Sequence, residues 1–154
     1  MTFVRQAAAA VVLITLSLWL QCGGMAALIG WGRTALGRDT HNLGRLRSAV
    51  LMVRFTTAII ALHVLQILMW ASFYRWSCFP LWESAFYFST ASYTTVGISD
   101  VVLPQMWRTL GPVEGVVGVL MCGLSASFLF AIVTRLVERE ARLTRELAEP
   151  LTEP

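Results

Sequence analysis

The stretch YTTVGISD, residues 93–100, decides how the rest of the sequence is interpreted. It closes an uncharged segment, residues 84–99, that is too short and too rich in serine and threonine to span a bilayer comfortably. Residues 81–92 are aromatic and weakly amphipathic, which predicts a short helix of about three turns. Non-helical backbone at membrane depth is tolerated only when it is buried in protein or lines a water-filled path. A short helix followed by a hydroxyl- and glycine-rich loop therefore predicts a re-entrant loop, and with it a pore or a binding site.

Longer uncharged runs surround this segment, and they cover residues 6–32, 55–74 and 115–134. Each run meets the roughly 20 residues that a spanning helix needs. The backbone inside a bilayer must also satisfy its own hydrogen bonds, which favours helices. We predict membrane helices at about residues 7–31, 49–74 and 112–136. The expected fold class is an all-α membrane protein with three transmembrane helices and a re-entrant helix and loop between the second and third.

The composition agrees with a membrane protein. Apolar residues make up 56% of the chain and charged residues only 14%, whereas a soluble domain carries about 25% charged residues. This excludes a disordered polar chain and argues against an ordinary water-soluble fold. The net charge is +3, but the arginines do not sit on an independent soluble domain, so we expect no nucleic-acid partner. No Ser-His-Asp set, zinc-ligand spacing or phosphate loop is evident, so we expect no enzyme.

The first apolar run has a second interpretation, because Arg5 followed by residues 7–20 resembles the start of a signal peptide. The run continues through Trp31, however, and no small-x-small cleavage site precedes a polar segment. We therefore expect a retained membrane helix. It would either pack around the outside of the pore assembly or bind a partner, and both alternatives stay open.

The distribution of arginine predicts the orientation, because cytoplasmic loops carry an excess of basic residues. Nine arginines lie in residues 33–54 and 135–145, and only Arg75 and Arg108 lie between the second and third predicted spans. We expect the loop at 33–54 and the C-terminus to be cytoplasmic, and the N-terminus and residues 75–111 to lie outside. The expected location is a bacterial-type inner membrane. Membrane lipid is an expected partner, because the 33–54 loop either contacts anionic head groups or only sets the topology.

The region around YTTVGISD resembles the pore domain of the two-transmembrane prokaryotic potassium-channel family. That family has an outer helix, a pore helix, a filter of the form Thr-Val-Gly-Tyr-Gly-Asp and an inner helix. Here the corresponding parts are the segment Ala85–Ser89, residues 94–100, Pro104 and an inner helix with two glycines, Gly118 and Gly123. The resemblance covers roughly residues 50–137. It implies an extra N-terminal helix with its arginine-rich loop (1–47), a pore domain (48–137) and a short charged tail (138–154).

This resemblance implies a selectivity filter in which backbone carbonyls replace the hydration shell of K⁺. The ligands of K⁺ would be the backbone carbonyls of Thr95, Val96, Gly97 and Ile98. The hydroxyl of Thr95 would be a further ligand. Ser99 completes the filter. Thr94, Tyr87 and Asp100 would support it, with Asp100 held by hydrogen bonds to the pore helix. One chain supplies one loop, so a closed pore implies a homotetramer. Potassium is then the permeant ion, and no cofactor is implied.

Two residues depart from the family pattern. Ile98 stands where the family has tyrosine, and Ser99 stands where it has the second glycine. Isoleucine lacks the hydrogen bond of the phenol. Ser99 must either take a backbone conformation that costs about 1–2 kcal/mol or adopt a different one. We expect a potassium-type channel. The alternatives are a weakly selective cation channel and a non-conducting membrane interaction or regulatory subunit.

The predicted helices also contain residues that bear on gating. Gly118 and Gly123 are candidates for a gating hinge, although small residues on membrane helices also serve close packing. In the second predicted helix, His63 and Gln66 either sense protons or bond a neighbouring helix.

Overall fold

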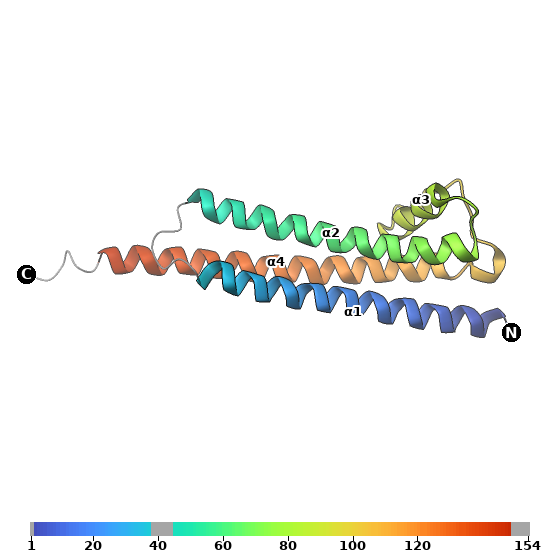
Figure 1. The fold of residues 1–154 in the computed structure, drawn as a ribbon, viewed down its shortest axis with the longest axis horizontal. Coiled ribbons are helices and arrows are strands. Elements are labelled where there is room, and N and C mark those ends of the chain that lie inside the picture. The colour runs from blue at the N-terminus through green and yellow to red at the C-terminus, as the bar shows by residue number, and fades with distance from the viewer. Residues whose placement is uncertain (1, 38–44, 149–154) are drawn as a thin grey trace, which may run out of the picture.

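The computed structural model describes residues 2–37 and 45–148. Its long helices lie side by side, and they are α1 (Thr2–Gly37), α2 (Arg45–Ser77) and α4 (Leu110–Ala148) (Figure 1). The short helix α3 (Trp82–Tyr93) lies beside the C-terminal end of α2, and a 3₁₀ helix, η1 (Gln105–Trp107), leads into α4. This confirms the predicted all-α class, with a short helix and a loop between the second and third long helices.

Each long helix contains a segment that is long and apolar enough to cross a membrane. These segments are Phe3–Arg33, Ala49–Ser77 and Gln105–Arg135. The helices themselves continue past the predicted spans, because α1 reaches Gly37 and α4 reaches Ala148. Charged residues end the apolar runs there without ending the helices, since arginine and glutamate are good helix formers.

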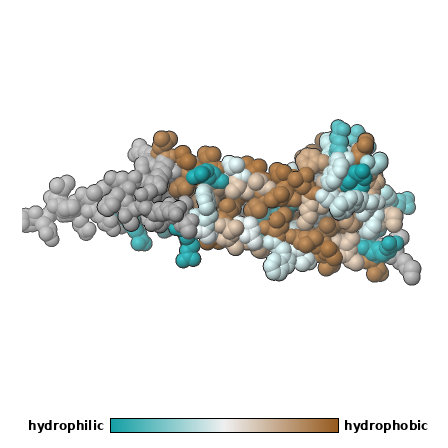
Figure 2. All heavy atoms as spheres, viewed as in Figure 1, coloured by the Kyte–Doolittle hydropathy of each residue, from teal (hydrophilic) through white to brown (hydrophobic). Residues whose placement is uncertain are grey.

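Large apolar side chains cover the outer surface of the bundle. Figure 2 shows them over its middle, while polar residues gather near the end that carries α3. Trp19 of α1, Phe130 of α4 and Val116 of α4 are each more than two-thirds exposed. Soluble monomers rarely expose apolar surface on this scale. The surface therefore suits contact with lipid or with other membrane helices.

The core lies where α2, α3 and α4 meet. Trp70 and Tyr74 of α2 are fully buried together with Met121 of α4. The ring of Tyr74 packs edge-on against Phe88 of α3, with 5.2 Å between centroids. Such edge-to-face pairs are favourable beyond the area that they bury. The aromatic core thus fixes α3 against the C-terminal end of α2.

The start of α1 lies at the same end of the bundle as α3 and η1. Gln6 donates a hydrogen bond to the backbone carbonyl of Gln105 at 3.4 Å, and it accepts one from the hydroxyl of Thr109. The last turns of α1 and α4 and the first turn of α2 lie at the opposite end (Figure 1). This relative arrangement agrees with the one derived from the arginines. Which end faces the cytoplasm stays a prediction.

Candidate functional site

Residues 94–100 form a loop directly after α3, which we call the 94–100 loop. The chain leaves the helix at Thr94, whose N–H and hydroxyl both donate to the carbonyl of Thr90, at 3.0 and 2.7 Å. The N–H of Gly97 turns back and donates to the carbonyl of Ala91 at 3.0 Å. The first half of the loop is therefore anchored to the last turn of α3.

Two residues of this loop have a positive φ. Gly97 has a φ of +67°, a conformation that glycine adopts without steric cost. Thr95 has a φ of +60°, and in the described parts of the chain no other residue besides glycine shows a positive φ. This conformation costs roughly 1–2 kcal/mol for a residue with a Cβ. The backbone strain therefore lies at Thr95, whereas the sequence placed the difficulty at Ser99.

Ser99 is not among the residues with a positive φ. Its hydroxyl donates to the carbonyl of Val101 at 2.9 Å and accepts from the N–H of the same residue at 3.1 Å. Serine hydroxyls commonly bond nearby backbone in this way. The side chain of Ser99 thus fixes the C-terminal end of the loop to the backbone of Val101.

Of the residues predicted to support the loop, Tyr87 contacts it as expected and Asp100 does not bond α3. The hydroxyl of Tyr87 donates to the carbonyl of Ile98 at 3.3 Å, so this residue does reach the loop. Asp100 is exposed and forms no hydrogen bond with the residues that the structure describes, so the expected bonds to α3 are not formed. Val96 and Ile98 are 60% and 75% exposed. The loop therefore lies at the surface of a single chain.

Glycines on one face of α4 let this helix approach the end of α3. A Cβ added at Gly118 would overlap the backbone carbonyl oxygen of Tyr93. A Cβ at Gly115 would lie 3.1 Å from the carbonyl oxygen of Ser92. Gly123 differs, because a Cβ there would meet nothing within 4 Å. Of the two hinge candidates, Gly118 therefore has a packing role against the residue before the loop, and Gly123 has open space.

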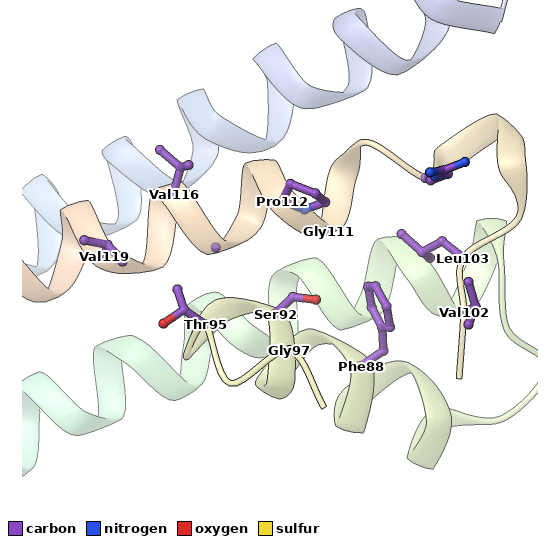
Figure 3. A pocket seen from close by; sticks show the side chains of 12 residues that line it. Phe88, Ser92, Thr95, Gly97, Val102, Leu103, Gly111, Pro112, Val116 and Val119 are labelled. Carbon is purple, nitrogen blue, oxygen red and sulfur yellow. The ribbon is translucent and has the colours of Figure 1, made fainter. Parts of the chain in front are cut away.

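An open cavity of about 590 Å³ lies between the loop and α4 (Figure 3). Thr95 and Gly97 line it from one side, and Val116 and Val119 line it from the other. Its lining is mostly apolar. Within residues 2–37 and 45–148, no group of three or more His, Cys, Asp or Glu side chains could hold a metal ion. The apolar lining of this cavity suits packing against other apolar groups.

A buried carboxyl group joins three helices behind this site. Glu114 of α4 is fully buried, and the hydroxyl of Tyr74 in α2 donates to its Oε2 at 2.8 Å. The Oγ of Ser89 in α3 lies 2.5 Å from its Oε1 and 3.0 Å from the carbonyl oxygen of Ile67. A hydroxyl has one hydrogen and cannot donate fully to both. Glu114 thus accepts from Tyr74 and lies within hydrogen-bond distance of Ser89, so its carboxyl group links α4 to both α2 and α3.

This geometry makes a prediction for two substitutions. Glu114→Ala leaves the hydroxyl of Tyr74 without its acceptor in a buried site, so we expect a loss of about 2–4 kcal/mol of stability. Glu114→Gln supplies one acceptor and one donor in the same places and should stay within about 1 kcal/mol of the unmodified protein. Thermal unfolding in detergent measures both. Equal destabilisation by the two variants would contradict a role of Glu114 as a hydrogen-bonding partner that an amide can replace.

The sequence analysis missed Glu114 as a functional residue and used it only as the boundary of an apolar run. A lone carboxylate at such a boundary is normally taken to lie in the head-group region. The available signal was its position beside a run of glycines, which brings a helix close to its neighbours.

One protein-family model matches the chain. The family is described as "Ion channel", and the match covers residues 49–135. It begins in α2, includes α3 and the 94–100 loop, ends within α4 and leaves α1 outside. Comparisons with curated proteins and with solved structures give no match.

Proposed function

Because the chain belongs to this family of ion channels, we propose that it is the pore-forming subunit of a homotetramer that conducts K⁺. Each chain contributes one 94–100 loop, and cyclic symmetry would place four loops around one axis. Rings of carbonyls would replace the hydration shell of the ion. The groups that face the ion would be the carbonyls of Thr95, Val96, Gly97 and Ile98, and the hydroxyl of Thr95.

The observation that carries this proposal is the position of α3. Its C-terminal end, at Tyr93, leads directly into the loop, and the last carbonyls of a helix carry partial negative charge. Residues 84–99 contain no charged side chain. The loop therefore offers a cation backbone and hydroxyl dipoles, which can coordinate K⁺ without binding it too tightly for release.

The exposure of the loop supports assembly from several copies. Val96 and Ile98 point away from the packed part of their own chain, and the cavity beside Thr95 and Gly97 is open and apolar. Apolar surface of this kind favours a protein neighbour. Transport through such a pore needs no covalent step, so the function that we propose is not enzymatic. We place it in a bacterial-type inner membrane, with the C-terminus in the cytoplasm.

Selectivity is tested by the reversal potential of the purified protein in a planar bilayer, with K⁺ on one side and Na⁺ on the other. We expect a value close to the K⁺ equilibrium potential, because the Thr-Val-Gly part of the loop is intact. A value near zero with clear current would contradict selectivity and favour the weakly selective cation channel.

A double variant, Ile98→Tyr with Ser99→Gly, serves as the matched comparison because it restores the two residues that depart from the family pattern. We expect it to shift the reversal potential no further than a few millivolts if the inner sites already select K⁺, and much further if the outer site limits selection. Absence of current in both proteins, when crosslinking shows assembled oligomers, would favour the interaction subunit or an unopened gate.

A further inference from the structure

Five polar side chains form a closed ring of hydrogen bonds inside the bundle. They come from all four α-helices, with two from α2: Gln21 (α1), His63 and Gln66 (α2), Tyr93 (α3) and Ser125 (α4). The ring runs through five contacts: Gln66 Nε2 to Gln21 Oε1 at 2.7 Å, Gln21 Nε2 to Ser125 Oγ at 2.9 Å, Ser125 Oγ to His63 Nε2 at 3.0 Å, His63 Nδ1 to Tyr93 Oη at 2.8 Å, and Tyr93 Oη to Gln66 Oε1 at 3.2 Å.

The donors and acceptors of this ring agree in one direction. Tyr93 donates its single hydroxyl hydrogen to Gln66, so the contact with His63 requires a hydrogen on Nδ1. The Nε2 of a neutral imidazole is then an acceptor, and the hydroxyl of Ser125 donates to it. Every member therefore donates once around the ring and accepts once.

Four of the five ring members are buried and His63 is partly buried, so each member depends on the others for its hydrogen bonds. Gln21 and Gln66 are fully buried, and Tyr93 and Ser125 are nearly so. Polar groups inside a membrane protein are stabilised only when they are paired, and removing one partner leaves the next without its bond. Helix α1 is therefore bonded into the pore domain, although it lies outside the family match.

One member of the ring, Tyr93, also lies at the start of the 94–100 loop. Tyr93 is the last residue of α3, two residues before the strained Thr95. Its hydroxyl is held by the ring, its carbonyl is held against Gly118, and its aromatic ring packs edge-on against His63 at 5.9 Å. A shift of this side chain would move the point from which the loop starts.

We propose that Gln21 of α1 is a positioning residue for the 94–100 loop, acting on Tyr93 through the hydrogen-bonded ring. Helix α1 would then contribute to the geometry of the pore, because it fixes the position at which the 94–100 loop begins. The consequence for ion selection rests on the proposed function, whereas the effect on the loop does not.

The test compares three single variants of the full chain and the double variant of Gln21→Leu with Tyr93→Phe. Gln21→Leu opens the ring at α1, and Tyr93→Phe opens it at α3 while keeping the aromatic ring. Ser17→Ala is the matched control, because buried Ser17 accepts a hydrogen bond from Trp70 Nε1 at 3.1 Å and so joins α1 to α2 without touching the ring. It lies about one helical turn from Gln21.

The first measurement is amide hydrogen exchange of residues 94–100, which needs no ion flux. We expect exchange about tenfold faster in Gln21→Leu and in Tyr93→Phe, with no further increase in the double variant, because both open the same ring. Ser17→Ala should exchange like the unmodified protein. Unchanged exchange in Gln21→Leu or in Tyr93→Phe, or equal acceleration by Ser17→Ala, would overturn the proposal. If Gln21→Leu yields no folded protein, Gln21→Ala opens the ring at the same residue and replaces it in the comparison.

The second measurement is the ratio of K⁺ to Na⁺ permeability. We expect Gln21→Leu and Tyr93→Phe to lower it severalfold and Ser17→Ala to leave it unchanged. If the unmodified protein passes no K⁺, the proposed function fails while the exchange result still decides the role of Gln21. If it passes K⁺ and its selectivity is the same in both ring variants, the positioning role in ion selection is wrong.

Discussion

Gly118→Ala should lower the yield of folded protein at least tenfold. The added methyl group would overlap the backbone carbonyl oxygen of Tyr93, and a backbone atom cannot rotate aside as a side chain can. Overpacking costs about 1–3 kcal/mol, and an overlap with a backbone atom belongs at the upper end of that range, above the gain of about 1 kcal/mol that alanine brings to a helix interior. Size-exclusion chromatography of the detergent-solubilised protein measures the yield.

Gly123→Ala is the control for this substitution, because it lies in the same helix and makes the same chemical change. Nothing lies within 4 Å of the Cβ that it adds, so the higher helix propensity of alanine should raise the melting temperature slightly. Equal yields for the two variants would show that α4 can move away from Tyr93 without loss.

Gly97→Ala should strongly reduce K⁺ flux while leaving the fold intact. The φ of +67° at this position costs a residue with a Cβ about 1–2 kcal/mol, and a tetrameric pore would contain four such positions. A relaxed loop would no longer present its carbonyls in one ring, so we expect flux into liposomes to fall by about two orders of magnitude.

The fold should survive this change because a Cβ at Gly97 meets no atom within 4 Å. The melting temperature in detergent should therefore stay within a few degrees of that of the unmodified protein. The two glycine variants are thus expected to fail differently, one in folding and the other in conduction. Persistent flux through Gly97→Ala would mean that conduction does not need a positive φ at this residue.

The membrane helices, the short helix and the loop were all predictable from the sequence. Uncharged runs report directly on membrane spans, and the predicted helix at 81–92 differs from α3 (Trp82–Tyr93) by one residue at each end. These features depend on local composition and on the length of each run, which a sequence displays without any knowledge of partners.

The polar contacts were not predictable in the same way. A glutamine in an apolar run indicates that a partner exists, and the suggestion that Gln66 bonds a neighbouring helix is confirmed by its bond to Gln21. The partner itself lies 45 residues away in the sequence, and hydropathy carries no information on such pairs. The positive φ at Thr95 was not predictable for another reason, because threonine normally avoids this conformation.

The two hinge candidates illustrate the same limit. Gly118 and Gly123 look equivalent as small residues in an apolar helix, because both fit the pattern of close packing. Only the spatial position of Tyr93 distinguishes them, since it occupies the space beside Gly118 and leaves that beside Gly123 open. A bend in α4 is therefore expected at Gly123, on the C-terminal side of the contact between Gly118 and Tyr93.

The hydrogen bond between Gln21 and Ser125 has a consequence for how the chain is made. The two residues are 104 positions apart, so at about 5–20 residues per second the ribosome needs roughly 5–20 s to deliver the second after the first. Throughout that interval α1 has been synthesised, but Gln21 lacks its partner in α4. The nascent protein therefore reaches its final hydrogen bonding only when the last helix has emerged. Chains truncated before Ser125 would keep the bond between Gln66 and Gln21 but would lack the one from Gln21 Nε2 to Ser125.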